Sequence, residues 1–291
     1  MNDKIVTVQK MQDYIQNHIN DKITLTDLAN IAFFSPWYAH RLFKEYTGLT
    51  VAEYIRKIRL TEAAKQIKNA NARIIDVALE MGFESHDGFT RAFVKEFKMT
   101  PSSYKNNHSP ITFFVPYGVK FRQLKENNKM ENVINVFIQV INKPERKVII
   151  KRGVKASEYW DYCNEVGCDI WGTLLSIDSL CGEPVCLWLP EKYILPNTSK
   201  YVQGVEVEMD YNGDIPNGFD LITLPTCEYL MFQGEPFEEE DYADAISSVQ
   251  QSMNKYDPSI IGYLWDDENP RIQLEPRGKR GYIELKAIKR K

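Results

Sequence analysis

The sequence predicts an α+β protein. An all-α N-terminal domain with two helix-turn-helix units is expected to precede a C-terminal α/β domain of two repeated strand-helix-strand units. Three observations predict this arrangement. Apolar residues recur at helical spacing through the N-terminal third of the chain. A motif in residues 25–46 returns in degraded form further along, and beyond residue 133 strand-like and helix-like segments alternate.

The first helix-turn-helix unit lies in residues 25–46, LTDLANIAFFSPWYAHRLFKEY. Phe33 and Phe34 interrupt the helical period of the apolar residues and predict a turn. Ser35 then suits an N-cap, and Pro36 suits the first helical position, because its fixed φ fits there and no backbone donor is needed. Two short helices joined by a tight turn indicate a helix-turn-helix.

The second unit is a repeat of the first. Six residues recur fifty positions further on, as Phe33 and Phe83, Ser35 and Ser85, Arg41 and Arg91, Phe43 and Phe93, Thr50 and Thr100, and Tyr54 and Tyr104. One such pattern is weak evidence, since helical hairpins with a serine cap are common, but two in register are not expected by chance. The second unit is expected as a helix at 74–81, a turn at Gly82 and a helix at 86–98 capped by Ser85.

The remaining N-terminal segments follow the helical period. An amphipathic helix is expected at 4–20, a long helix at 51–68, and a short helix from Thr100 through Tyr104. The boundaries are therefore expected at 1–108 for the helical domain, 109–132 for a connector and 133–291 for the second domain. Within the connector, the ITFFV segment is expected to pack on the protein and residues 123–132 to be flexible.

Composition is consistent with two domains of different character. The chain has 291 residues, of which 43% are hydrophobic. Residues 1–108 hold 15 Lys and Arg against 12 Asp and Glu, whereas residues 109–291 hold 21 against 28. A basic first part and an acidic second part suit a nucleic-acid-binding domain joined to a different module.

Several classes of protein are not indicated. The five cysteines show no metal spacing and are expected to be free thiols in a reducing cytosol, so no metal or cofactor is predicted. Neither a signal peptide nor an apolar run of about 18 residues is found, so a cytoplasmic protein that does not span a membrane is expected.

Two motif blocks carry a resemblance. The first comprises Phe34-Ser35, Arg41-Leu42-Phe43-Lys44, Thr47-Gly48, Tyr54-Ile55-Arg56, Arg59-Leu60 and Ala63. The second comprises Ile75-Asp76-Val77-Ala78, Gly82-Phe83, Ser85, Phe89, Arg91, Phe93, Phe97, Thr100-Pro101 and Tyr104. With these blocks residues 5–107 resemble AraC/XylS-type transcription regulators, and Trp37 with Arg41 resembles their Rob-like branch. The resemblance implies seven helices with two recognition helices about 34 Å apart, which enter successive major-groove segments.

The resemblance also implies the residues that face double-stranded DNA. They are Trp37, His40, Arg41 and Lys44 in the first recognition helix, and His86, Asp87, Thr90 and Arg91 in the second. Arginine can bind guanine O6 and N7 with two hydrogen bonds, and Trp37 could contact a thymine methyl group. Asp87 either reads a cytosine amino group or caps its own helix. The charged face of helix 51–68 is either solvated, or the helix ties the two DNA-reading units at a fixed separation and lends charge to phosphates.

The second domain also repeats. Strands are expected at 133–141, 147–152, 184–189, 202–209, 228–234, 271–275 and 281–288, and helices at 155–166, 169–179 and 239–255. The segment 148–153 resembles 229–234, and 183–190 resembles 269–276, so two similar halves are predicted.

This pattern resembles the GyrI-like effector-binding domain, whose two units form a cleft where their sheets meet. The resemblance maps a ligand-binding glutamate of hydrophobic-cation sensors onto Glu275, although Arg277 stands nearby and could neutralise it. Trp160, Trp171 and Trp188 are candidates for aromatic walls, through stacking and cation–π contacts.

The function expected from these resemblances is a sequence-specific, DNA-binding transcription regulator whose second domain senses a small hydrophobic or cationic effector. Two alternatives remain. The acidic second domain could bind a protein partner such as RNA polymerase or gyrase. Some GyrI-like proteins resemble hydrolases, but all four His lie in residues 1–108 and no nucleophile–base motif is present, so no catalytic residue is expected.

Overall fold

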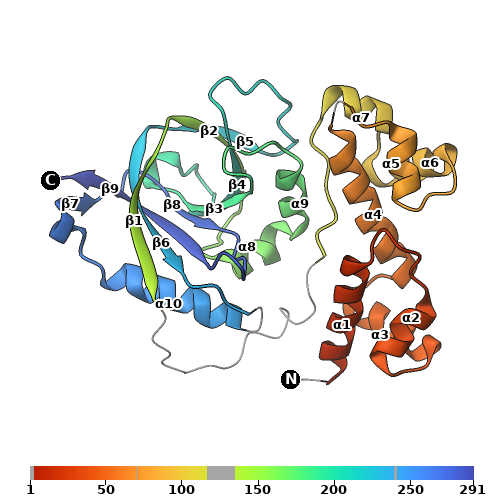
Figure 1. Ribbon diagram of the computed structural model, residues 1–291. Coiled ribbons are helices and arrows are strands. Elements are labelled where there is room, and N and C mark those ends of the chain that lie inside the picture. The colour runs from red at the N-terminus through yellow and green to blue at the C-terminus, as the bar shows by residue number, and fades with distance from the viewer. Residues whose placement is uncertain (1–2, 70, 117–134, 239–240) are drawn as a thin grey trace. The chain divides into compact units, whose positions relative to one another are not determined.

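The computed structural model describes residues 3–69, 71–116, 135–238 and 241–291. The chain divides into two compact units, a helical unit in residues 1–127 and a second unit in residues 128–291. The predicted flexible stretch at 123–132 lies outside the described residues. Figure 1 shows the elements of both units.

The helical unit has the seven helices that the resemblance implies. They are α1 (Asp3–Asn17), α2 (Leu25–Ala32), α3 (Pro36–Thr47), α4 (Val51–Ile67), α5 (Ile74–Glu80), α6 (His86–Phe97) and α7 (Pro101–Asn107). Helices α2 and α3 form the first helix-turn-helix, and α5 and α6 form the second. The long helix α4 runs between the two units of the repeat (Figure 1).

Side-chain caps fix where these helices begin. The hydroxyls of Ser35 and Ser85 accept hydrogen bonds from the backbone N–H groups of Tyr38 and Gly88, three residues on. Thr50 does the same at α4, and Glu53 reaches back to it in a capping box. The caps predicted at Ser35 and Ser85 are therefore confirmed.

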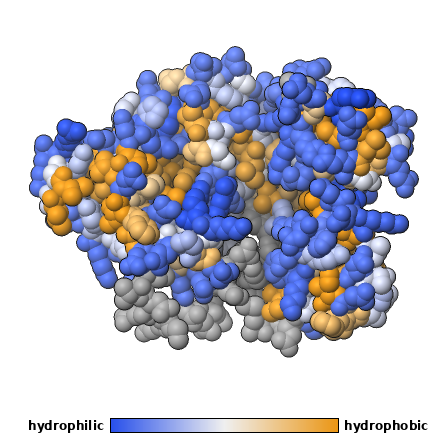
Figure 2. All heavy atoms as spheres, in the orientation of Figure 1, coloured by the Kyte–Doolittle hydropathy of each residue, from blue (hydrophilic) through white to orange (hydrophobic). Residues whose placement is uncertain are grey.

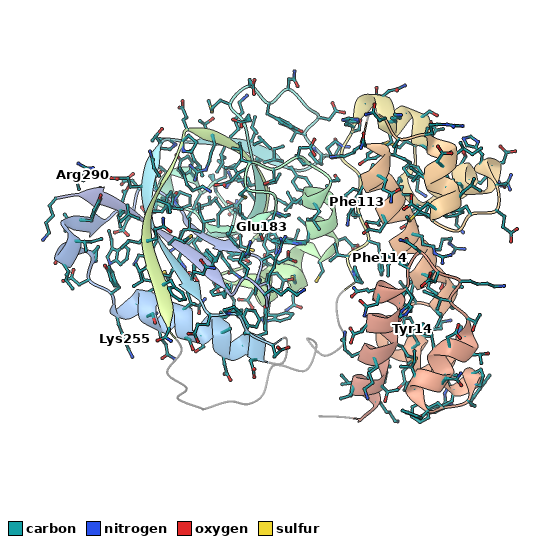
Figure 3. The ribbon with its side chains drawn as sticks, viewed as in Figure 1. Tyr14, Phe113, Phe114, Glu183, Lys255 and Arg290 are labelled. Atoms are coloured by element: carbon teal, nitrogen blue, oxygen red, sulfur yellow. The ribbon has the colours of Figure 1, made fainter. Side chains whose placement is uncertain are left out.

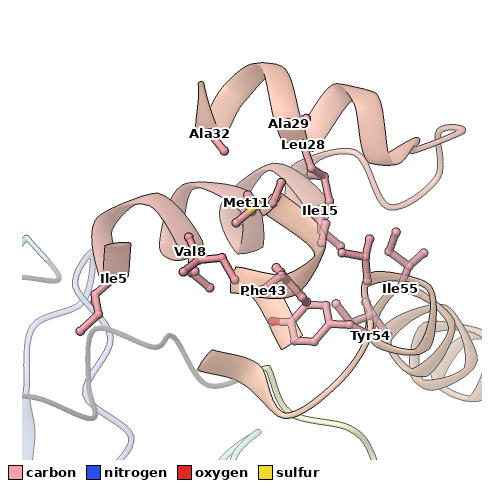
Figure 4. Close-up of a cluster of buried hydrophobic side chains, with 14 residues drawn as sticks. Ile5, Val8, Met11, Ile15, Leu28, Ala29, Ala32, Phe43, Tyr54 and Ile55 are labelled. Atoms are coloured by element: carbon pink, nitrogen blue, oxygen red, sulfur yellow. The ribbon is translucent and has the colours of Figure 1, made fainter. Parts of the chain in front are cut away.

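A buried apolar cluster holds the first helix-turn-helix against α1 and α4. Val8, Met11 and Ile15 of α1 are fully buried against Leu28 and Phe43 (Figure 4). The ring of Phe43 meets that of Tyr54 edge to face, with 5.1 Å between centroids. The apolar stripe predicted for the opening helix thus packs behind the recognition helix.

The backbone corrects the register of the repeat by one residue. Phe34 N–H donates to Ala29 O in the first turn, and Phe83 N–H donates to Ala78 O in the second, so Phe34 is the counterpart of Phe83. Phe33, with φ 53°, therefore takes the left-handed position that Gly82 takes with φ 74°. The offset of fifty is wrong in the turn because the second turn carries one more residue before Ser85.

Helix α4 holds the two helix-turn-helix units together through its charged residues. Lys57 pairs with Glu96 of α6. Arg59 donates from Nε to the carbonyl of Ile19 at 3.0 Å and from Nη2 to the carbonyl of Asp21 at 2.5 Å. These contacts agree with the alternative in which this helix ties the two units together, while its contribution of charge to phosphates stays a prediction.

The start of the connector packs on the helical unit. Ile111 and Phe113 are buried, and Phe114 meets Tyr54 edge to face at 5.2 Å between centroids. The backbone N–H of Phe114 donates to Thr61 Oγ1 at 2.9 Å. The labels of Phe113 and Phe114 in Figure 3 mark this segment beside α4. The packing predicted for the ITFFV segment is confirmed for its described residues.

The second unit is built on one antiparallel sheet. Its strands are β1 (Val136–Lys143), β2 (Arg146–Arg152), β3 (Val185–Trp188), β4 (Tyr201–Val207), β5 (Asp220–Leu224), β6 (Cys227–Gly234), β7 (Tyr263–Trp265), β8 (Arg271–Leu274) and β9 (Ile283–Arg290). Its helices are α8 (Tyr159–Val166), α9 (Asp169–Leu175) and α10 (Tyr242–Lys255), with 3-10 turns at Glu191–Tyr193 and Pro258–Ile261.

The sheet order relates the repeated segments. It runs β1-β6-β9-β8-β3-β4-β2-β5, with β7 paired to β9, and every pairing is antiparallel. Strands β6 and β8 therefore mirror β2 and β3 about the β3–β8 pairing. The α+β class is confirmed, but the α/β description of the second unit is wrong because the sheet is antiparallel. The short strands β5 and β7 were not predicted.

Helices cover one face of this sheet. Ile149 and Val205 pack with Leu174 of α9, and Phe232 packs with Val249 and Met253 of α10. Because side chains alternate along a strand, Ile150 and Tyr229 point to the opposite face, where a third cluster forms. The centre of the helix-bearing face lies between the two helix groups.

Apolar side chains also reach the surface of the second unit. Phe137 and Ile138 of the edge strand β1 and Leu264 of β7 are exposed. Figure 2 shows hydrophobic side chains gathered over these two strands.

Candidate DNA-binding face and effector site

The exposed face of α3 is aromatic and basic. Trp37, Arg41 and Lys44 are exposed, at spacings that place them on one side of the helix, and His40 is half-buried beside them. The guanidinium of Arg41 lies 5.0 Å from the Trp37 ring centroid and 5.1 Å from that of Tyr38. This stacking orients the Arg41 guanidinium and its N–H donors before any ligand binds.

The face of α6 is less basic. Arg91 is exposed, but Asp87 and Val94 stand where α3 has Trp37 and Lys44. His86 Nδ1 lies 3.7 Å from Asp87 Oδ1. Ser85 caps the N-terminus of α6. Asp87 therefore lies in the first turn of this helix, where the helix dipole favours a carboxylate.

Thr90 is placed differently from the other members of this set. It is half-buried, and its Oγ1 is buried without a hydrogen-bond partner among the described residues. The structure therefore brings seven of the eight predicted residues to the two outward faces, with the Thr90 hydroxyl directed inward.

In the second unit, Glu275 already has an arginine partner. Arg277 Nε donates to Glu275 Oε2 at 3.1 Å, and both side chains are partly exposed. Arg277 and Arg280 also approach Glu183, which is buried. The neutralisation that the sequence raised as a possibility is what the structure contains.

The three tryptophans differ in position. Trp171 is buried on α9, Trp160 is exposed on α8, and Trp188 is half-buried at the end of β3. Trp188 Nε1 donates to the carbonyl of Ser157 at 2.9 Å, and its ring meets that of Tyr201 edge to face. Of the three, Trp188 lies on the sheet at the centre of the helix-bearing face.

Sequence reasoning missed Glu284, a fully buried carboxylate on that face. Arg271 Nε donates to its Oε1, Tyr282 donates to its Oε2 at 2.7 Å, and Gln250 of α10 approaches at 3.4 Å. The segment IELK at 283–286 places a glutamate within an apolar strand, which is the signal that could have found Glu284.

Arg271 links Glu284 to Trp188. Its guanidinium carbon lies 4.0 Å from the Trp188 ring centroid while its Nε holds Glu284. Arg271 and Trp188 are direct cross-strand partners, and Trp188 is in turn paired with Tyr201. A row of aromatic and charged side chains therefore crosses the sheet.

Phenols and thiols complete this face. Burial raises the pKa of Tyr201 and Tyr282 well above the ordinary phenol value, so both hydroxyls stay protonated and can donate. Burial also raises the pKa of the Cys186 thiol to about 12. A hydrogen bond with Cys168, together with burial, raises the pKa of Cys163.

Comparison with known proteins identifies relatives of the helical unit. A helix-turn-helix domain model matches residues 28–107. SoxS, a regulatory protein of Salmonella typhimurium, is 34% identical over 99 residues, which cover 34% of this chain and 92% of SoxS. The chain belongs to the AraC family of transcription regulators.

Other relatives of the AraC family share only a part of their length with this chain. The uncharacterised regulator YbfP of Bacillus subtilis is 38% identical over 124 residues, covering 43% of this chain and 39% of YbfP. The transcriptional regulator Rob of Salmonella typhimurium is 32% identical over 105 residues, covering 36% of each chain. The AraC-type resemblance is thus confirmed. Among the described residues, no helix is long and apolar enough to cross a membrane.

Proposed function

We propose that α3 and α6 enter successive segments of the DNA major groove, and that the second unit senses a small molecule which changes DNA binding. The exposed, prestacked Arg41 carries the first part. An arginine held over two rings loses less conformational freedom when it binds a guanine edge, so it suits base readout better than a solvated lysine does.

The two recognition helices are not proposed to contribute equally. Trp37, Arg41 and Lys44 give α3 a cationic, aromatic face, whereas α6 presents Arg91 beside Asp87. The acidic Asp87 opposes phosphate binding, so α3 is the dominant reading helix and α6 refines the choice of site.

Selection of binding sites from random duplex DNA, followed by variants, tests this proposal. Arg41→Ala should cost about 1–3 kcal/mol on the selected site and relax preference at one position. Arg290→Ala removes the same charge from the second unit, where the side chain is exposed, and should leave binding unchanged. Equal loss on selected and random DNA would make Arg41 a phosphate contact and would refute base readout.

Effector sensing is supported by the centre of the helix-bearing face. Trp188, Arg271 and Glu284 form a connected aromatic and charged group there, as in the GyrI-like domains that the sequence resembles. Both Glu275 and Glu284 carry arginine partners, so a cationic effector would have to displace one of them. An effector acts only if it binds one DNA-binding arrangement better than another.

The test of sensing is the dependence of DNA binding on pure compounds. Operator affinity measured with a panel of small hydrophobic cations, anions and neutral molecules should change with at least one compound. Glu275→Gln and Glu284→Gln should alter that response without altering affinity in its absence. An operator affinity that no compound changes would favour a protein partner, such as RNA polymerase, for the acidic second unit.

A further inference from the structure

Beside the Trp188–Arg271 pair lies a cavity of about 1030 Å³, at the end of β3 and the start of β8 and against the middle of β9. Apolar groups line part of it, including Leu189, Pro190 and Ile194. Four cations line it, Lys192, Lys200, Arg271 and Lys286, together with the carboxylates of Glu191, Asp266, Asp267 and Glu268. We propose that this strand-end cavity binds an apolar carboxylate, whose charged group lies between Arg271 and Lys286. The inference rests on the proposed sensing function and names its ligand class.

The sheet register sets Arg271 and Lys286 opposite each other. Ile272 pairs with Leu285 and Gln273 with Glu284 across β8 and β9. One step further along the same register, Arg271 faces Lys286. Like charges directly opposite on neighbouring strands destabilise a sheet, and an anion between them would relieve that cost.

Neither Arg271 nor Lys286 is fully neutralised by the described residues. Arg271 donates to Glu284 through Nε, and the two Nη groups of Arg271 have no hydrogen-bond partner among the described residues. Lys286 Nζ lies 4.2 Å from the Trp265 ring centroid, and no carboxylate among the described residues is within 4.0 Å of it. Burial lowers the pKa of Lys286, the charges of Asp267 and Glu284 act to raise it, and the charge of Arg271 acts to lower it.

The acidic side chains that line the cavity are bound within the protein or exposed to solvent. Glu268 pairs with Lys192 at 3.3 Å. Asp266 accepts hydrogen bonds from Glu268 N–H and the Asn269 amide in its own turn. Glu191 and Asp267 are exposed. Glu284 is the one carboxylate of the described residues that is paired with either Arg271 or Lys286, so a ligand carboxylate would meet the Nη groups of Arg271 and the ammonium of Lys286.

Calorimetric titration of the full chain with three probes of equal size tests the assignment. Naphthalene-2-carboxylate should bind at least tenfold more tightly than 2-naphthalenemethanol, and 2-naphthylmethylammonium should bind no better than the alcohol. Lys286→Met keeps the packing on Trp265 but removes the charge, and should cost about tenfold for the carboxylate alone. Lys286→Arg should restore binding. Lys192→Met, which removes a rim cation, should change it less than twofold.

The outcomes separate two failures. If the ammonium or the alcohol binds most tightly, the carboxylate assignment is overturned and sensing is left in place. The same conclusion follows if Lys286→Met leaves carboxylate binding intact while thermal melting shows that the variant is folded. Absence of binding by all three probes would overturn the assignment as well. The operator-affinity assay with the wider panel then decides separately whether sensing stands.

Discussion

Phe33→Gly is expected to stabilise the helical unit. Phe33 adopts φ 53° at the end of α2, and its side chain is 88% exposed. A left-handed conformation costs an L-residue about 1–2 kcal/mol, while glycine adopts it freely. The same position in the second helix-turn-helix carries Gly82.

The net effect is smaller than the strain relieved. Glycine loses more conformational freedom on folding, which offsets roughly 0.5–1 kcal/mol, and an almost fully exposed ring forfeits little packing. A gain of about 0.5–1 kcal/mol remains, which corresponds to about 3 °C in melting temperature for a unit of this size. The backbone hydrogen bonds that end α2 are unaffected, since Phe33 N–H and Phe34 N–H are retained.

Urea unfolding followed by hydrogen exchange and mass spectrometry measures the change and assigns it to the helical unit. The matched control is Gly82→Ala, which should destabilise, because φ is 74° there and the new Cβ would lie 2.9 Å from Arg59 Nη1. Unchanged or reduced stability in Phe33→Gly would refute the reasoning. It would mean that the Phe33 ring contributes a contact worth more than the strain.

Three further outcomes follow from buried and capping groups. Glu206→Gln leaves Arg146, which is 1% exposed, without its counter-charge and should cost the second unit about 3–5 kcal/mol in denaturant unfolding; a change near zero would contradict a buried pair. Thr50→Ala should cost the helical unit about 1 kcal/mol at neutral pH. Its hydrogen bonds lower the pKa of Glu53, so their contribution is present above the ordinary carboxyl pKa and is lost as pH falls through the lowered value; the stability difference between the two proteins should narrow in acid, where the bond from Glu53 N–H to the Thr50 hydroxyl remains. Alkylation at pH 8 should label exposed Cys181 well before Cys186, whose pKa of about 12 leaves it a thiol; rapid labelling of Cys186 in the native protein, read by mass spectrometry, would argue against its burial.

Local signals determined most of the helical unit. Ser35, Thr50 and Ser85 begin their helices because a hydroxyl one residue before the helix can accept a backbone hydrogen bond, an interaction contained within four residues. The outward residues of α3 were expected from the family resemblance, and helical spacing places them on one side of the helix. The turn register did not, because the chain absorbs an extra residue before Ser85 without changing the repeat on either side.

The second unit depended on long-range pairing. The sequence by itself predicted two similar halves, and it placed strands near residues 147–152, 228–234 and 271–275, since period-two apolar patterns are local. Only the tertiary structure decided that every strand pairs antiparallel, and that β3 and β8 join the halves. Strand partners are set by contacts far apart in the chain, so Glu284 could not be distinguished from Glu275, nor Arg271 placed between Trp188 and Lys286, before the sheet brought them together.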